Sequence, residues 1–359
     1  DARRAAGAAL RAVSEGRDPA DERKAAQSAR SDVRNRVDAV LDEFLVRHVD
    51  AKNRENTARE TKRFIDNELR PTWGDRHIAS ITRRDVIQLL DRLVDRGAPA
   101  SANRVHAILR KFFNWTVERD IRDSTPVANI KAPAKTVSRD RVLSDQEIRL
   151  LWWACIDVGW PFGTLAQLLL LTGQRREEVA GICRDELSLG KADPRWEIPP
   201  SRAKNDKPHT VWLAPQAVKL IASLPTIDGS DLLLTTNGET SISGFSKGKV
   251  ALDGAMRSLA IADAVERGVN DLDAVSIEPW RLHDLRRTAA SGMQALGVAP
   301  HIVDATLNHR SGAIKGLARV YLRHDYADER RAALYAWAKR VVAIAGKRPK
   351  SARGTRLTR

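Results

Sequence analysis

The sequence predicts a mainly α-helical protein with a small antiparallel β-sheet, arranged as an N-terminal helical bundle followed by a larger second domain. Apolar residues recur three and four positions apart through most of the chain, which indicates helices with one buried face. Strand-like runs are short and lie at 196–199 and 210–213, on either side of a turn at Asn205 and Asp206. A length of 359 residues exceeds one typical hydrophobic core and favours two domains with flanking segments.

The chain carries 61 lysines and arginines against 46 acidic residues, a formal net charge of +15. This charge favours a nucleic-acid partner, although many basic surfaces are only solvated. Cys155 and Cys183 lie in apolar, helix-like surroundings, which indicates free thiols in a reducing compartment and neither a disulfide framework nor a metal site. The densest apolar run, 165–171, is far shorter than the ~20 residues that cross a bilayer. We therefore expect a soluble protein of a bacterial-type cytoplasm, associated with the chromosome and not with a membrane.

The first segment, 1–31, is a basic, alanine-rich helical pattern interrupted by glycine and proline at 16–19. Two interpretations are open, the remnant of a preceding domain or a linker with a frayed helix. Because the chain starts at Asp1 and not at methionine, we suspect a truncated start.

Residues 32–123 are predicted to form the helical bundle, because the pattern there is helical throughout with no alternating run. The helix at 101–117 directs apolar side chains inward, namely Val105, Ile108, Leu109, Phe112 and Phe113. It leaves three cations, Arg104, Arg110 and Lys111, for solvent or for phosphate groups. Cations on such a helical face are usually only solvated.

Two capping boxes predict where helices begin, one at Thr82 and one at Ser144. In each, a hydroxyl and an acidic residue three positions later can satisfy free backbone NH groups. Apolar residues before the cap and after the acid support both, namely Ile81 with Val86 and Leu143 with Ile148. The second box starts the second domain, predicted at 143–330, with helices at 144–155 and about 161–171.

Residues 124–142 contain two prolines and no sustained apolar period, which indicates an interdomain linker. Its cations, which include Lys131, Lys135 and Arg139, suit contact with a DNA backbone. Beyond the second domain, 331–359 is predicted to be a helix and a basic tail. The helix has one apolar stripe, formed by Leu334, Trp337, Ala338, Val341, Val342 and Ala345, and the tail after Gly346 has six basic residues and no acid.

The most informative pattern is His283 and Arg286, three residues apart on one predicted helical face. An imidazole and a guanidinium at this spacing are suited to holding a phosphate. Two features support the prediction of a helix here. One is an apolar stripe at helical spacing, formed by Leu282, Leu285, Ala289, Met293 and Leu296. The other is Gly297, which is expected to end the helix. Further blocks lie at 172–178, before this helix, and at 307–310, after it, with Tyr321 twelve residues past His309.

Two arginines, two histidines and a tyrosine in this order resemble the tyrosine recombinase (phage integrase) family, over residues 144–337. The resemblance implies a catalytic set of Arg175, Lys204, His283, Arg286, His309 and Tyr321, supported by Glu178. The chain has Asn308 at a position where members of this family commonly have glycine. The family places a lysine on a β-hairpin between the first two blocks. Lys204 matches this lysine better than Lys207 does, because of its spacing to Val211. Tyr326 is the alternative nucleophile, since Tyr335, the remaining tyrosine, falls in the following helix.

The resemblance implies that Tyr321 attacks phosphorus to give a 3′-phosphotyrosyl link while Lys204 protonates the departing 5′ oxygen. Arg175 and Arg286 are suited to hold the non-bridging oxygens, because guanidinium groups bind them in bidentate fashion. His283 can accept the tyrosine proton. The sequence shows no clustered carboxylates, no His-x-x-x-His spacing and no glycine-rich phosphate loop, so we expect neither a metal nor another cofactor.

The implied function is integration or excision of a prophage or genomic-island element through a Holliday junction, by a homotetramer on paired double-stranded attachment sites. Accessory DNA-bending proteins are further candidate partners. Segment 1–31 resembles the end of an arm-site-binding domain, and 143–330 resembles the tyrosine-recombinase catalytic domain. Residues 32–123 resemble the core-DNA-binding domain, which implies that Arg104, Arg110 and Lys111 contribute to DNA binding. The last helix has two interpretations: it docks on its own domain, or it passes to a neighbouring protomer, as is frequent in this family. The alternatives are a type IB topoisomerase-like enzyme and a DNA-binding regulator with a vestigial site.

Overall fold

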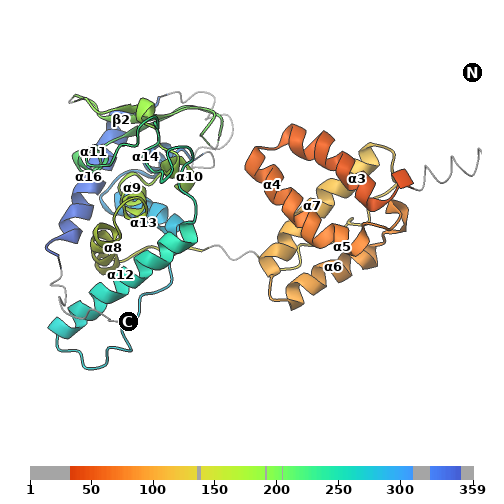
Figure 1. The fold of residues 1–359 in the computed structure, drawn as a ribbon, viewed down its shortest axis with the longest axis horizontal. Coiled ribbons are helices and arrows are strands. Elements are labelled where there is room, and N and C mark those ends of the chain that lie inside the picture. Colours follow the sequence, from red (N-terminus) through yellow and green to blue (C-terminus); the bar gives the residue numbers. More distant parts are fainter. Residues whose placement is uncertain (1–32, 136–138, 191, 204, 310–323, 349–359) are drawn as a thin grey trace, which may run out of the picture. The chain divides into compact units, whose positions relative to one another are not determined.

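The structure is a computed structural model that describes residues 33–135, 139–190, 192–203, 205–309 and 324–348. The predictions for segment 1–31, for Lys204 and Tyr321 and for most of the basic tail lie outside these residues. The chain divides into two compact units, Asp1–Ser138 and Arg139–Arg359, which are described separately below. Helices dominate both units and one small sheet lies in the second, so the predicted fold class is confirmed (Figure 1).

The first unit is a bundle of helices, as predicted (Figure 1). Its elements are α3 (Val37–Phe44), η1 (Leu45–Asp50), α4 (Glu55–Phe64), η2 (Ile65–Leu69), α5 (Arg70–Trp73), η3 (Ile78–Ser80), α6 (Arg83–Asp95) and α7 (Pro99–Glu118). The five apolar residues predicted to face inward from α7 are all buried. Aromatic rings fill the centre, where Phe44 meets Phe112 edge to face at 5.3 Å between ring centroids. The capping box at Thr82 is confirmed, with both of its reciprocal hydrogen bonds to Asp85.

The predicted linker is shared between the two units. Val127 is buried in the core of the first unit, and the Arg83 guanidinium donates to the carbonyl of Ala128. Asn103 forms two hydrogen bonds with the backbone of Ala134. A single buried valine satisfies no helical or strand period, and therefore the sequence pattern did not reveal this packing. Residues from Arg139 onwards belong to the second unit.

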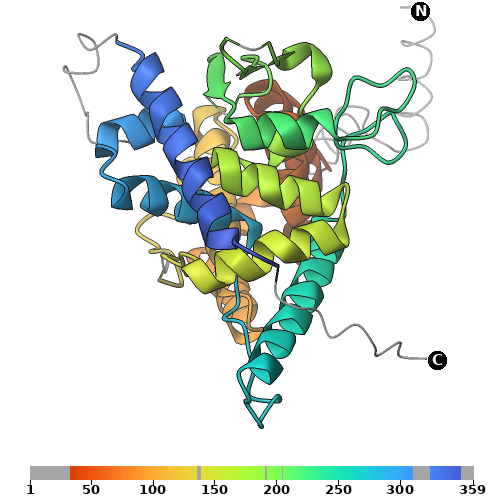
Figure 2. The same cartoon turned by 90° about the vertical axis from the view of Figure 1, so that its left-hand side faces the viewer.

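The second unit packs its helices around α9, whose residues are all buried except the half-buried Phe162. Its helical elements are α8 (Asp145–Val158), α9 (Phe162–Thr172), α10 (Arg176–Ala180), η4 (Arg184–Glu186), α11 (Pro215–Ala222), α12 (Phe245–Glu266), α13 (Leu282–Ala295), α14 (Pro300–Thr306) and α16 (Ala327–Ala345). Figure 2 shows α12, in teal, extending beyond the helices it packs on. The capping box at Ser144 is confirmed, and both cysteines are free thiols, Cys155 buried and Cys183 half-buried.

The second unit also contains a three-stranded antiparallel sheet. Its strand order is β1 (Leu187–Ser188), β2 (Arg195–Ile198) and β3 (His209–Trp212). Strands β2 and β3 are the two predicted ones, in a register that pairs Trp196 with Val211. Strand β1 has only two residues, too few to show a period in the sequence. The connection from β2 to β3 contains Asn205 and Asp206, and Asp206 has the positive φ of a tight turn.

Helix α16 packs on its own unit. The indole of Trp337 is buried and donates to the carbonyl of Leu170 in α9, at 2.7 Å. The apolar stripe is therefore buried within the unit, as the first of the two interpretations expects, and exchange of this helix between protomers stays a prediction. Two residues that were expected in buried stripes are exposed instead. Val342, 41% exposed, lies one residue off the buried face of α16, and Leu296, 43% exposed, follows the last turn of α13, where Gly297 redirects the chain.

Candidate active site

Arg175 stands at the start of α10, directly after the turn that ends α9. Gly173 makes that turn with a φ of +65°, a conformation that glycine adopts without strain. The buried carboxylate of Glu178 accepts hydrogen bonds from the backbone N of Arg175, at 3.1 Å, and from its Nη1, at 3.0 Å. The Nη2 of Arg175 donates to the carbonyl of Asn308, at 3.1 Å. The guanidinium is thus held in one orientation, and Glu178 has the supporting position expected of it.

Arg286 lies on α13, next to the buried stripe of that helix, and is 4% exposed. Its guanidinium reaches across the unit and donates to two carbonyls, that of Gly173 at 2.7 Å and that of Leu307. Burial lowers the pKa of Arg286 to about 9, and the nearby positive charge of Arg175 contributes to this shift. Among the described residues no carboxylate forms an ion pair with Arg286. The two guanidinium groups face a single carboxylate, that of Glu178, and the positive charge left over suits a phosphate.

The two histidines lie near these arginines. His283 is exposed on the first turn of α13, and partial burial of its ring together with the charges of Arg287 and Arg286 lowers its pKa. The backbone N of His309 donates to the carbonyl of Asp304, and its Nδ1 lies 3.2 Å from the Asp304 carboxylate. Burial, followed by the charge of Arg286, lowers the pKa of His309. Both imidazoles are therefore neutral near pH 7 and can accept a proton.

The remaining two expected catalytic residues, Lys204 and Tyr321, lie outside the described residues. Both alternatives are described. Lys207 is exposed in the turn between β2 and β3. The half-buried ring of Tyr326 meets His301 and His324 edge to face, with centroids 5.2 Å and 4.8 Å away. These ring contacts hold Tyr326 at the start of α16, and the choice of Tyr321 as the nucleophile stays a prediction.

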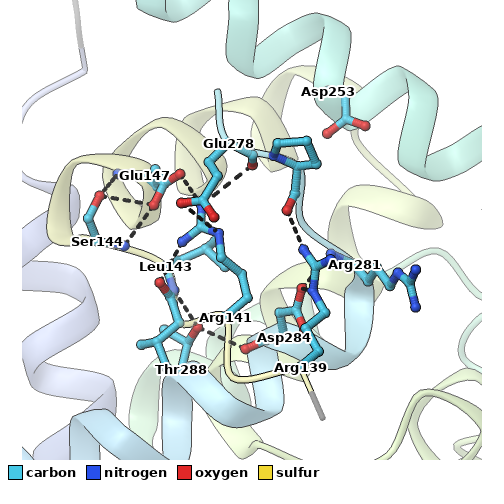
Figure 3. A network of polar contacts seen from close by, with 12 residues as sticks. Arg139, Arg141, Leu143, Ser144, Glu147, Asp253, Glu278, Arg281, Asp284 and Thr288 are labelled. Carbon is cyan, nitrogen blue, oxygen red and sulfur yellow. Dashed lines mark hydrogen bonds and ion pairs between the residues drawn. The ribbon is translucent and has the colours of Figure 1, made fainter. Parts of the chain in front are cut away.

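Asp284 is a buried residue of this site that the sequence pattern did not single out. Its carboxylate, with no exposed surface, accepts from the backbone N of Arg281 at 2.8 Å and forms an ion pair with Arg139 at 3.1 Å (Figure 3). It forms a second ion pair with Arg287, at 2.6 Å. Arg139 also donates to the carbonyl of Pro279. Arg139, expected to contact DNA, is thus engaged within its own unit. The signal available in the sequence was an aspartate at the third position of a helix.

The residues that follow Arg139 extend this network along the chain. Arg141 forms ion pairs with Glu147 and with Glu278, the second at 3.3 Å. The backbone N of Leu143 donates to the hydroxyl of Thr288, at 3.0 Å (Figure 3). The start of the second unit is therefore attached to the first turns of both α8 and α13. The latter turn carries His283 and Arg286.

The other expected DNA-binding residues lie in the first unit, and all of them are exposed. Arg110 and Lys131 line one cavity of about 520 Å³ together with the amides of Asn114 and Asn129. Arg104 forms an ion pair with Glu60, at 3.4 Å. Lys111 follows Arg110 on the exposed side of α7, and Lys135 ends the described part of this unit.

Two kinds of feature are missing from the described residues. No three histidine, cysteine, aspartate or glutamate side chains there gather closely enough to bind a metal ion. None of the helices in the same part of the chain combines the length and the apolar character that crossing a membrane requires.

The helical fold and the convergence of Arg175, Arg286 and His309 define a tyrosine recombinase of the integrase type. Two family models match, the phage integrase family over residues 141–327 and the phage integrase central domain over 23–133. The chain belongs to the phage integrase family. The two matches together account for both of its compact units.

Curated relatives include two prophage integrases of Escherichia coli K12. IntZ is 26% identical over 294 residues, 81% of this chain and 67% of that protein, and IntA is 23% identical over 293 residues, 80% and 66% respectively. The chain therefore spans about two thirds of the length of these relatives. Among solved structures, a lambda integrase tetramer bound to a Holliday junction matches with a TM-score of 0.61 and 17% identity, over 88% of this chain and 90% of that one. This last likeness is one of fold.

Proposed function

We propose that the chain is a site-specific DNA recombinase that integrates or excises a mobile element. The observation that carries this proposal is the pair of fixed guanidinium groups, Arg175 and Arg286, anchored on the carbonyls of Asn308, Gly173 and Leu307. Each group has its orientation set by the protein before any substrate binds. Preorganised donors of this kind stabilise the charge that develops on a phosphate during attack.

The reaction follows from these groups and from the family's catalytic set. The phenolic oxygen of Tyr321 attacks the phosphorus, and its proton passes to His283. The bond from phosphorus to the 5′ oxygen breaks, and Lys204 donates the proton that this oxygen needs. Arg175, Arg286 and His309 hold the non-bridging oxygens throughout. The 5′ hydroxyl of a second duplex then attacks the 3′-phosphotyrosyl link, restores the tyrosine and forms a Holliday junction.

The partner in this proposal is double-stranded DNA, bound at paired attachment sites by a homotetramer. The lambda integrase tetramer on a Holliday junction, which shares the fold, supports this assembly. We assign the first unit to core-site binding through Arg104, Arg110, Lys111, Lys131 and Lys135, and the second to catalysis. Accessory DNA-bending proteins and a cytoplasmic, chromosome-associated location complete the proposal, which the two Escherichia coli prophage relatives support.

The covalent intermediate provides the test. On a nicked duplex attachment site, the unaltered chain should form a protein–DNA adduct that survives denaturation, and Tyr321→Phe should abolish it while DNA binding persists. Tyr326→Phe is the matched control and should still form the adduct. Adduct formation by Tyr321→Phe, with loss in Tyr326→Phe, would move the nucleophile to Tyr326. No adduct from the unaltered chain would favour the vestigial regulator, and relaxation without strand exchange between duplexes would favour the topoisomerase.

A further inference from the structure

Asn205 and Asn308 exchange two side-chain hydrogen bonds. The Nδ2 of Asn205 donates to the Oδ1 of Asn308 at 2.5 Å, and the Nδ2 of Asn308 donates to the Oδ1 of Asn205 at 3.3 Å. The two residues are 103 positions apart in the sequence. Such a reciprocal amide pair constrains both the distance and the relative rotation of the two segments that carry it.

The position of this amide pair in the chain relates it to the reaction. Asn205 follows Lys204 directly, in the connection between β2 and β3, and Asn308 precedes His309 directly, after α14. The backbone carbonyl of Asn308 also accepts from the Nη2 of Arg175. One residue therefore connects the phosphate-binding arginine to the segment that carries the expected leaving-group acid.

The backbone at Asn308 explains which side chains are tolerated there. Its φ is +52°, a left-handed conformation that glycine adopts freely and that asparagine tolerates better than most residues. Glycine would satisfy the backbone equally well but would remove the contact with Asn205. An amide is also neutral, whereas a carboxylate at this position would oppose the positive charge of Arg175 and Arg286. Asparagine thus supplies a contact and leaves the charge of the site unchanged.

We propose that the amide pair of Asn205 and Asn308 is a positioning device for Lys204. Lysine has a long, flexible side chain, and a proton donor acts efficiently only when it is held close to the oxygen that leaves. The pair fixes the residue next to Lys204 against the wall of the phosphate site and so limits where the lysine can reach. This inference rests on the proposed recombinase function.

A substrate with sulfur at the bridging 5′ position tests this role. A thiolate leaves without a proton, and therefore cleavage of that substrate does not need the lysine. With the natural oxygen substrate, Asn308→Gly and Asn205→Ala should each slow adduct formation by about 10- to 100-fold. With the sulfur substrate, both variants should stay within about threefold of the unaltered chain. Lys204→Ala should show the same rescue with a larger loss on oxygen, and Lys207→Ala should show neither.

Controls separate positioning from folding. Asp120→Gly places glycine at an exposed residue with a φ of +54° in the first unit and should leave cleavage of both substrates unchanged. An equal loss on oxygen and sulfur in Asn308→Gly would overturn the proposal, because the pair would then support Arg175 or the fold. Full activity of both variants on oxygen, or rescue of Lys207→Ala in place of Lys204→Ala, would also overturn it. The unaltered chain reports on the recombinase function separately: a vestigial regulator would form no adduct on either substrate, and a topoisomerase would form one without exchanging strands between duplexes.

Discussion

Arg139 and Asp284 form an ion pair across 145 residues of sequence, with 3.1 Å between Nε and the buried carboxylate oxygen. Asp284 follows His283 and precedes Arg286 by two positions on the first turn of α13. The first residue of the second unit is therefore bonded to the turn that presents two of the proposed catalytic groups. This ion pair makes the orientation of that turn dependent on a residue outside the helix.

We expect Asp284→Asn to lower the free energy of unfolding by about 1–3 kcal/mol, since a charged acceptor with three donors is replaced by a neutral one. The substitution keeps the size of the side chain, so packing is not altered. The exposed residue Asp140 provides the control, and Asp140→Asn should change stability by less than about 0.5 kcal/mol. Urea unfolding of the full chain measures both. Equal stabilities would show that the ion pairs add nothing to α13.

Gly292 on α13 faces the indole of Trp337, and a Cβ at this position would overlap the ring. Gly292→Ala should therefore destabilise the chain by about 1–3 kcal/mol, although alanine is the better helix former. Gly254 in the middle of α12 has open space where a Cβ would stand, so Gly254→Ala should stabilise by about 0.5–1 kcal/mol. Thermal unfolding of the two variants should give shifts of opposite sign. A shift of the same sign in both would contradict the packing of α16 on α13.

His209 introduces a dependence of stability on pH. It is 7% exposed, its Nε2 lies 3.1 Å from the carbonyl of Thr306, and its Nδ1 accepts from Arg330. Burial, followed by the charge of Arg330, lowers the pKa of His209 to about 3. Below the unfolded pKa of 6.5 only the unfolded chain binds this proton, so stability falls by up to about 1.4 kcal/mol per pH unit between pH 6.5 and 3.

Urea unfolding at pH 7.5, 6 and 5 should show this loss, and His209→Gln should remove the part of the pH slope that His209 contributes. His77→Gln, at an exposed histidine of the first unit, separates the effect of the substitution type from that of burial. A parent chain whose stability did not decrease below pH 6.5 would disprove the neutral, buried state of His209.

Most of the features that could be predicted depend on residues that are close together in the sequence. Thr82 with Asp85, and Ser144 with Glu147, mark helix starts because both partners lie within one turn, and the hydrogen bonds appear as expected. The contact of Asn205 with Asn308 could not be predicted, because it joins distant segments and leaves no period in the sequence. The hydrogen-bond partners of Arg286 could not be predicted for a related reason. Its partners are backbone carbonyls, which have no residue signature.

The two anchored guanidinium groups of Arg175 and Arg286 have a thermodynamic consequence for the proposed reaction. A phosphodiester in DNA and a phosphotyrosyl diester carry the same single negative charge. The counter-charge that the site supplies is therefore equally suited to the intact strand, the covalent intermediate and the rejoined strand. Such a site accelerates breakage and rejoining alike and favours neither, so the direction of recombination has to be set by groups that do not touch the phosphate.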